Sequence, residues 1–592
     1  MLAGKGKGCG VVVRVRKYSG VVILPAAVLG LLFALFMVVG QSFAESGSFD
    51  QMLATPQRVA LSLVKILGYT TLFGALVTLA FTWLDRRSAV LAAHPVAPSH
   101  HAEPQPGRSC RRFWVAFLAL MVCWGVFLVI FFPGSLPWDG ARSLNQFLTN
   151  APLENHHPVL MNALYGALMV LGRFLGSDNA GIFLIVLFQT VVCALVLASA
   201  FVWMEKLRAP RPLVVACSLF FLLFPLWGSF AQAAFKDTLF FGVFLWFVLR
   251  VLAVMVQPVS ARRASTWILL LVAAGVVCLT RNNGIYLVLP TLVLLLAFTP
   301  RKKPLAVCAL GVVCLYAGAT MLLYPALGVN MHEGKEMLSI PFQQTARYAQ
   351  TYPDEATEEQ RQAIDAVLPY DQLGQLYNPN LSDPVKERFT GNNQALGAYF
   401  KAWFEQGLAH PGCYVQATIA NTYAYFYPNV LIDNGGDRPI LTFEVVGPPI
   451  NTSYDVHYVM PQEVREGAVS AIEAAFDIPV LQQLYSPALY IWLLLAAAAY
   501  ALHARRLDVL VLCAPCLMLV LTNIAGPLNG HLRYTLPVLA TLPVILSLLC
   551  SAPLRPERPH SFDRPCPRER SGEAASSVPH EERHVGGRNL VK

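Results

Sequence analysis

The chain has 592 residues, of which 55% are hydrophobic and 13% are charged, and its formal net charge is +9. A soluble domain carries about twice this share of charged residues, so the composition excludes an ordinary soluble protein. Apolar runs of about twenty residues recur along the chain and predict an all-α polytopic membrane protein. We attribute the basic excess to loops near lipid headgroups, which argues against a nucleic-acid partner.

In chain order, thirteen apolar segments are candidates for membrane spans. They are residues 18–43, 60–84, 113–132, 158–175, 180–204, 212–229, 238–256, 266–280, 284–298, 305–325, 488–503, 508–524 and 535–551.

The distribution of basic loops decides how many of these segments cross the membrane, because Lys and Arg are enriched in cytoplasmic loops. If all thirteen crossed, the loop 205–211 and every later basic loop would lie outside the cell. Segment 158–175 is short and carries Asn162, Tyr165 and Arg173, which suits an amphipathic helix at the outer interface. Placing it there predicts about twelve spans in the cell membrane, with the N- and C-termini cytoplasmic.

The same topology divides the chain into five parts. Residues 1–112 form an N-terminal two-helix membrane module with a cytoplasmic Pro/His-rich linker, and 113–325 form a membrane core with an outer loop at 133–179. Residues 326–487 form a mostly helical extracytoplasmic domain, 488–551 the C-terminal spans, and 552–592 a disordered basic cytoplasmic tail. Within the large outer loop, Thr357 and Gln360 predict a capping box, and Asp383-Pro384 predicts a helix start with Asp383 as the N-cap.

Several ionisable residues fall in the predicted outer turns. Such groups at a membrane boundary raise the free energy unless they are paired or reach water. For one residue, an ion pair at a helix end is the simplest interpretation. Several cations on the outer side run against the positive-inside rule and indicate a phosphate-binding site. The residues are Lys236 and Asp237, then Arg281 and Asn283, and finally His531, Arg533 and Tyr534 at the start of the last span.

The outer loop 133–179 contains Asp139, Gln146, Glu154 and the pair His156-His157. A carboxylate at position 139 suits a general base, a metal ligand or a turn residue, since Asp-Gly after Pro-Trp is also a turn signal. The histidine pair precedes a proline and suits either a helix cap or a ligand contact. Two adjacent histidines lack the spacing of a zinc site.

The order of these features resembles the GT-C superfamily of integral-membrane glycosyltransferases, which take a sugar from a polyprenyl-phosphate carrier at the outer face. The likeness is carried by the span 113–132, Asp139, the stretch ENHHPVLMNALYG and the span 180–204. The motifs AFKD, RNNG and the late RY look like those of a poorly characterised bacterial branch. The resemblance covers residues 113–551.

The resemblance implies an inverting glycosyl transfer from a polyprenyl-phosphate-linked sugar to a glycan, lipid or protein acceptor. Asp139 would be the base, and Lys236, Arg281 and Arg533 would stabilise the departing lipid phosphate. Many relatives carry two adjacent acids where Asp139 stands alone, and this departure weakens the case for a metal-dependent mechanism. A divalent metal ion is kept as the alternative cofactor. The remaining substrate-binding candidates are Gln146, Glu154, His156, His157, Asp237, Asn283, His531 and Tyr534.

Three other function classes remain as alternatives. A polysaccharide polymerase or ligase would use lipid-diphosphate-linked glycans and the same cations. A transporter or flippase would place polar residues near the membrane midplane, often with inverted repeats. A structural membrane protein would leave the polar motifs without a common purpose. The enzyme hypothesis requires Asp139, Lys236, Arg281 and Arg533 to converge at the outer face beside a lipid-accessible groove.

Overall fold

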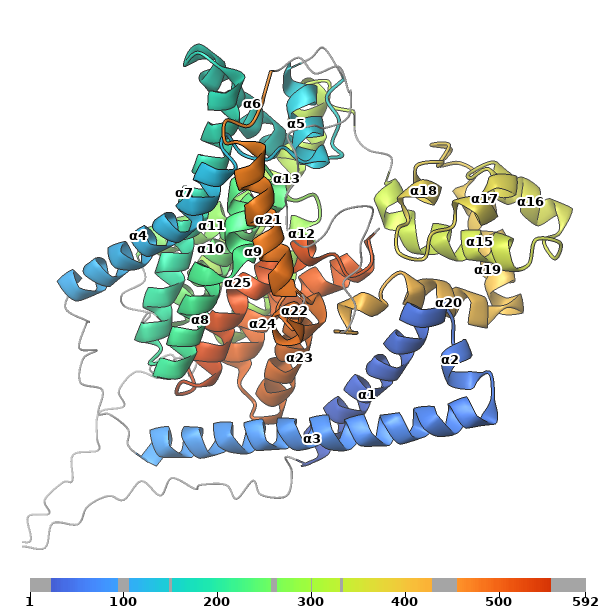
Figure 1. Cartoon of the computed structure of the whole chain (residues 1–592), viewed down its shortest axis with the longest axis horizontal. Helices are drawn as coiled ribbons and strands as arrows, with labels where there is room; N and C mark the ends of the chain where they lie inside the picture. Colours follow the sequence, from blue (N-terminus) through green and yellow to red (C-terminus); the bar gives the residue numbers. More distant parts are fainter. Residues whose placement is uncertain are drawn as a thin grey trace, which may run out of the picture.

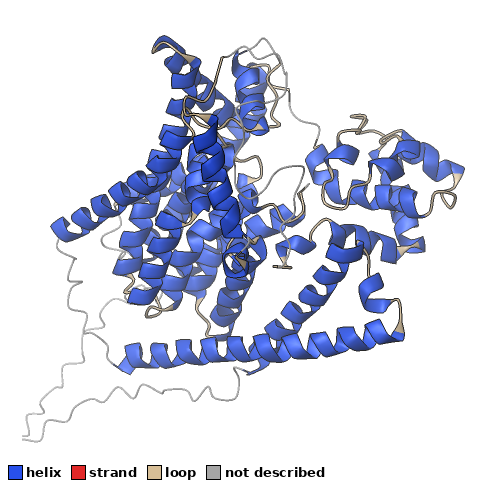
Figure 2. Ribbon diagram, in the orientation of Figure 1, coloured by secondary structure: helices blue, strands red, loops and turns tan. Residues whose placement is uncertain are grey.

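The computed structural model of the protein describes a chain of helices. It covers residues 23–93, 106–148, 152–256, 263–299, 301–330, 334–428, 455–476, 478–526 and 528–554. In these ranges every regular element is helical, and extended pairing is limited to three isolated β-bridges (Figure 2). The all-α prediction is therefore confirmed for the described residues, whereas the predicted tail at 555–592 and most of the Pro/His-rich linker lie outside them.

Eight described helices are long and apolar enough to cross a membrane, which supports the prediction of a multi-pass membrane protein. They are α1 (Ile23–Ser46), α3 (Pro56–Ala93), α4 (Pro106–Ile130), α7 (Asp178–Lys206), α10 (Lys236–Val256), α13 with its continuation (Lys302–Ala326), α24 (Leu507–Ile524) and α25 (Leu532–Leu549).

A ninth candidate span is broken. Helices α8 (Arg211–Leu223) and α9 (Pro225–Gln232) meet at an angle of 44°. The break lies at Phe224, whose backbone is extended because Pro225 follows it. Four further apolar helices are shorter: α6 (Val159–Phe174), α11 (Ala264–Thr280), α12 (Gly284–Phe298) and α23 (Pro487–His503). The predicted number of twelve spans stays a prediction.

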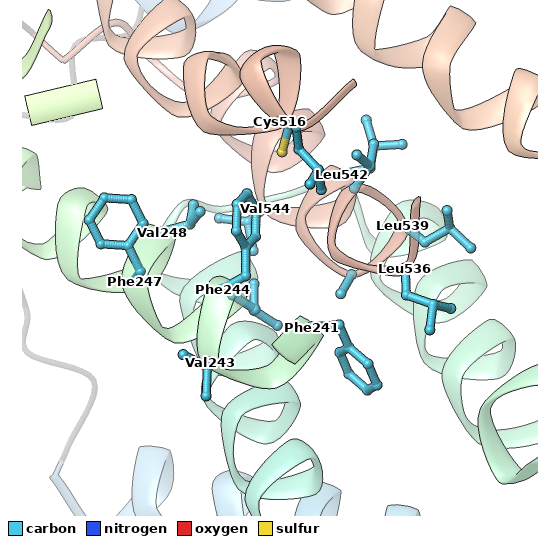
Figure 3. Close-up of a cluster of buried hydrophobic side chains, with 14 of the residues drawn as sticks. Phe241, Val243, Phe244, Phe247, Val248, Cys516, Leu536, Leu539, Leu542 and Val544 are labelled. Atoms are coloured by element: carbon cyan, nitrogen blue, oxygen red, sulfur yellow. The ribbon is translucent and has the colours of Figure 1, made fainter. Parts of the chain in front are cut away.

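Helices α10 and α25 form the centre of the bundle. They pack against each other, and α10 also contacts α7 and α11. Figure 3 shows aromatic and aliphatic side chains of α10 beside those of α25 and Cys516 of α24. Phe244, Leu536 and Val544 in this cluster are fully buried. Close packing of this kind leaves little freedom to either helix, so the residues at their first turns are placed accurately.

The N-terminal pair α1 and α3 attaches to the side of the bundle. Gly30 of α1 lies so close to α3 that an added Cβ would be 2.8 Å from the Thr70 carbonyl oxygen and 3.0 Å from the Gly74 Cα. Phe33 and Phe73 stack with their ring centroids 3.9 Å apart, next to Trp492 of α23. The pair is therefore packed into the rest of the chain.

Residues 334–428 form a compact unit beside the bundle, here called the appended domain (Figure 1). Its core is separate from the bundle core and includes the buried residues Phe342, Leu373 and Tyr399. It contains η3 (Lys335–Leu338), α15 (Ser339–Thr351), α16 (Glu358–Asp365), α17 (Tyr370–Leu376), α18 (Asp383–Lys386), α19 (Leu396–Ala409), α20 (Pro411–Ala420) and η4 (Tyr423–Tyr425).

The helix-start predictions for this domain have different outcomes. The capping box of Thr357 and Gln360 is confirmed. The prediction that Asp383 is an N-cap is wrong by one residue, because Ser382 takes that position. The Asp383 carboxylate instead forms an ion pair with the buried Lys386, whose Nζ lies 2.7 Å from Oδ1.

Two further helices of the predicted 326–487 domain lie with the bundle. They are α21 (Gln462–Phe476) and α22 (Pro479–Gln483), and Figure 1 shows them against the bundle, apart from the appended domain. Ile472 of α21 belongs to the bundle core. The helical part of 326–487 therefore has two locations.

Gly30→Ile should separate α1 from α3, because its side chain would overlap backbone atoms that cannot move aside. Overpacking of this kind destabilises a protein by about 1–3 kcal/mol. We expect a lower melting temperature for the purified protein in detergent. Gly68→Ile is the matched control, since nothing lies within 4 Å of an added Cβ at that position of α3. Equal melting temperatures for both variants would contradict the packing.

Candidate functional site

Five helices begin around one group of charged residues. Helix α5 (Trp138–Leu148) begins beside Asp139, α6 follows His157, and α10 begins with Lys236. Helix α12 follows Arg281, and α25 begins immediately before Arg533. Helix N-termini present unpaired N–H groups and a partial positive charge, so this end of the bundle favours anions.

A short backbone pairing brings Asp139 and Lys236 together. Ser135 and Ala233 form a parallel β-bridge, in which Ala234 N–H donates to the Ser135 carbonyl at 2.8 Å. Gly140 then packs onto the same segment, where an added Cβ would lie only 2.4 Å from the Ala234 carbonyl oxygen. The pairing aligns the residue before Gly140 with the first residue of α10.

The first half of the charged group centres on one oxygen atom. Lys236 Nζ lies 3.0 Å and Arg533 Nη1 3.1 Å from the same Oδ2 of Asp139. Burial raises the pKa of Asp139, but the charges of Lys236 and Arg533 lower it by more, so its pKa lies well below its ordinary value. Asp139 is 25% exposed and Lys236 22% exposed. The ion pair is thus formed, and still reachable from solvent.

His157 completes this half. Lys236 Nζ donates to His157 Nδ1 at 2.7 Å. Burial, followed by the charge of Lys236, lowers the pKa of His157 to about 2, so the ring is neutral at physiological pH. Because an ammonium group can only donate, Nδ1 must accept and the proton must sit on Nε2.

The second half is an ion pair with aromatic rings around it. Arg281 Nη1 lies 3.2 Å from Asp237 Oδ1. The centroid of the Tyr534 ring lies near both guanidinium groups, 5.2 Å from Arg281 Cζ and 5.1 Å from Arg533 Cζ. Cation–π attraction to this one ring offsets part of the repulsion between the two like charges. Together, the two halves make up the ionic cluster: Asp139, His157, Lys236, Asp237, Arg281, Arg533 and Tyr534.

His157 Nε2 and Asp237 Oδ2 are buried atoms of the ionic cluster that have no hydrogen-bond partner among the described residues. Leaving a buried donor or acceptor unpaired raises the free energy of the folded protein by about 1–3 kcal/mol. One unpaired N–H donor and one unpaired carboxylate oxygen are therefore positions where a polar ligand would be favoured.

Asp139, Lys236, Arg281 and Arg533, which the enzyme hypothesis requires to converge, all lie in the ionic cluster. Asp237, His157 and Tyr534 join them. His531 adjoins the cluster as the N-cap of α25, with its ring 5.3 Å from that of Tyr534. Asn283 holds the corresponding position before α12.

Three predicted residues face away from the cluster. Glu154 pairs with Arg142 at 3.2 Å. Gln146 Oε1 accepts a hydrogen bond from Asn162 at 2.8 Å in the buried contact between α5 and α6. His156 Nδ1 lies 3.8 Å from Glu336 of the appended domain. These contacts suit structural roles in the loop that carries His157.

Two residues that support the cluster were missed as site candidates. Gln189, fully buried in α7, donates from Nε2 to the carbonyls of Ala231 and Ala233 just before Lys236. Asn282 donates from Nδ2 to the Asn155 carbonyl at 2.7 Å, next to the histidine pair. A long amide inside an apolar span was the available signal for Gln189, since such a residue needs polar partners.

Residues 148–561 match the model of DUF6020, which is described as a family of unknown function. The chain belongs to this family. The region of the DUF6020 match includes His157, Lys236, Arg281 and Arg533, but begins after Asp139. The chain matches no curated protein and no solved structure. The activity of this DUF6020 protein must therefore be argued from its own geometry.

The described part of this DUF6020 protein contains no preformed metal site. Among those residues, no three His, Cys, Asp or Glu side chains gather as ligands for one ion. Asp139 and Asp237, the acids of the cluster, are each paired with a basic side chain. The cluster as it stands is arranged for an anion.

His157 provides a test of the cluster through pH. Its pKa is lower in the folded protein than the ordinary 6.5, so the unfolded chain binds a proton that the folded chain does not. Stability should therefore fall as pH drops below 6.5, by about 1 kcal/mol per pH unit from this residue. His157→Gln should lose less of its melting temperature between pH 7 and pH 5 than the unaltered protein.

The matched control is His457→Gln, because the His457 side chain is 70% exposed. We expect its melting temperature to follow the unaltered protein at each pH. If the His157 and His457 variants behave alike, His157 is not held neutral by the cluster.

Proposed function

We propose that this protein is a membrane glycosyltransferase of the GT-C type, which moves a sugar from a polyprenyl-phosphate carrier to an acceptor at the outer membrane face. The observation that carries the proposal is the ionic cluster. Three basic side chains from separate parts of the chain meet two carboxylates where five helices begin. Preorganised cations of this kind stabilise a phosphate leaving group.

The proposed topology has twelve spans. The eight long helices and the bent α8–α9 pair give nine, and α11, α12 and α23 would supply three more. Helix α6 would then lie at the outer interface. An even number of spans returns both termini to the cytoplasm, as the basic loops require. The ionic cluster and the appended domain would both lie outside.

The charge of the cluster suits a monophosphate carrier. Lys236, Arg281 and Arg533 are opposed by Asp139 and Asp237, and His157 is neutral. One positive charge therefore remains uncompensated. The phosphodiester of a polyprenyl-phosphate sugar carries one negative charge, which would neutralise the cluster. A lipid diphosphate would bring one negative charge too many into a partly buried site, where unpaired charge is unfavourable.

Transfer would proceed by direct displacement. The Asp139 carboxylate accepts the proton of an acceptor hydroxyl while the hydroxyl oxygen attacks the anomeric carbon. The bond from that carbon to the phosphate oxygen breaks on the opposite face, and the lipid phosphate leaves with the electron pair. The configuration at the anomeric carbon is inverted. Arg281 and Arg533 would take up the new phosphate charge, for which guanidinium groups are well shaped.

The low pKa of Asp139 makes it a weak base while Lys236 and Arg533 both bind its Oδ2. Donor phosphate would compete for these two cations. Weakening either pair raises the pKa of Asp139, because the attraction of a nearby cation favours the carboxylate. The base would therefore become effective only after the donor has bound.

Asp139→Asn should abolish transfer and retain donor binding. Loss of a general base lowers turnover by about 10²- to 10⁴-fold. Removing the carboxylate also frees Lys236 and Arg533, so affinity for the donor should stay equal or increase. Purified protein in lipid nanodiscs, supplied with a defined polyprenyl-phosphate sugar, gives both turnover and binding.

Glu154→Gln is the matched control. It makes the same chemical change in a partly exposed pair, whose contribution is small. Its turnover should stay near normal. Near-normal turnover of Asp139→Asn would instead reject the base assignment. Loss of donor binding in that variant would mean that Asp139 organises the cluster without acting as a base.

The same purified protein tests the function class. Sugar transfer from the monophosphate donor supports the proposal. Transfer only from a lipid-diphosphate-linked glycan would make the protein a polymerase or ligase. Movement of a labelled lipid across the membrane without any transfer would identify a flippase. The charge argument above predicts the first result.

A further inference from the structure

Arg533 of the ionic cluster sits four residues after a turn that the appended domain holds in place. We propose that Asn529, in this turn, is a positioning residue that couples the appended domain to Arg533. The expected effect on turnover rests on the proposed function. The contact itself stands on geometry alone.

Asn529 is fully buried, and its side chain is completely used. Nδ2 donates to Asn380 Oδ1 at 3.0 Å and to the Ala420 carbonyl at 2.9 Å. Oδ1 accepts from the Ala424 N–H at 3.1 Å. All three partners belong to the appended domain. Asparagine supplies two donors and an acceptor at this length, whereas aspartate has no donor and leucine has neither.

The neighbouring residues of the turn bind the same domain. The Asn529 N–H donates to the Asn380 carbonyl at 3.0 Å, and the Leu528 carbonyl accepts from the Tyr425 hydroxyl at 3.0 Å. Gly530 has a left-handed φ of +61°, and an added Cβ would lie 2.4 Å from the Ala424 Cβ. The turn is therefore seated against the domain along its length, with no space for a larger residue at position 530.

The turn leads directly into the cluster. His531 is the N-cap of α25, and Arg533 lies in the first turn of that helix. Packing of α25 in the bundle places Arg533 near Asp139, and the turn 528–530 connects the first turn of that helix to the appended domain. Displacing a catalytic group by about 1 Å can lower turnover about 10²-fold. We therefore expect a displaced turn to shift Arg533 relative to Asp139.

The appended domain also touches the other side of the cluster. Glu336 of the domain lies 3.8 Å from His156, the neighbour of His157. Lys386 holds Glu336 from within the domain at 2.7 Å. The appended domain therefore contacts both the turn before Arg533 and the loop that carries His157. An acceptor that moves the appended domain would therefore affect the ionic cluster through both contacts.

Asn529→Ala in the full-length protein tests the coupling in two ways. Hydrogen exchange of the peptide that spans residues 524–535 should become faster, because the turn loses three side-chain hydrogen bonds. In the transfer assay, kcat should fall about 10-fold or more while KM for the polyprenyl-phosphate sugar changes little, since Arg533 acts on the leaving phosphate.

A matched control and a double variant separate positioning from general damage. Arg347→Gln loosens the same domain elsewhere, because Arg347 donates to the Gly47 carbonyl at 3.1 Å and, within the domain, to Tyr377 Oη and Gln416 Oε1. It should leave both exchange at 524–535 and kcat near normal. In an Arg533→Ala background, Asn529→Ala should lower kcat no further, because its effect passes through Arg533.

Each outcome decides the proposal. Unchanged exchange in Asn529→Ala, or an equal fall of kcat in Arg347→Gln, overturns it. An additive loss in the double variant overturns it as well. If the unaltered protein transfers no sugar, the proposed function fails, and the exchange measurement still accepts or rejects the hold of Asn529 on the turn.

Discussion

The sharing of one Asp139 oxygen by Lys236 and Arg533 is the interaction on which the rest of the site depends. It joins α5, α10 and α25, and the latter two helices are the centre of the bundle. Charges at a membrane boundary are tolerated only when they are paired or hydrated. The pairing thus stabilises the helix ends and also keeps cations ready near the surface. Structure and proposed chemistry therefore draw on the same ion pairs.

Side-chain amides hold the backbone that carries these ions. Gln189 caps the segment before Lys236, Asn282 fixes the loop before His156, and Asn529 seats the turn before Arg533. In each case a neutral amide donates to backbone carbonyl groups. Burying a charged donor at the same place would cost more free energy, because a charge loses more hydration than an amide does. Neutral amides thus hold the backbone on several sides of the cluster.

Much of the architecture was predictable from local pattern. Each described apolar segment formed a helix, and the Thr357 capping box formed. Pro225 produced a break between α8 and α9, but the two helices can still be counted as one bent span. Asp383 failed as an N-cap because Lys386, buried beside it, takes its carboxylate. The helices at 462–483 joined the bundle because Ile472 packs there, and contacts of that kind leave no mark in a local window.

The sequence by itself determined that this is a helical membrane protein and which ionisable residues stand at helix boundaries, because apolar length and loop charge are local properties. Only the tertiary structure decided which charges meet. Asp139 finds Lys236 and Arg533 at separations of 97 and 394 residues, whereas Glu154, equally acidic, is taken by Arg142 twelve residues away. Partner choice depends on where helix ends lie in space, and that follows from the packing of the whole bundle.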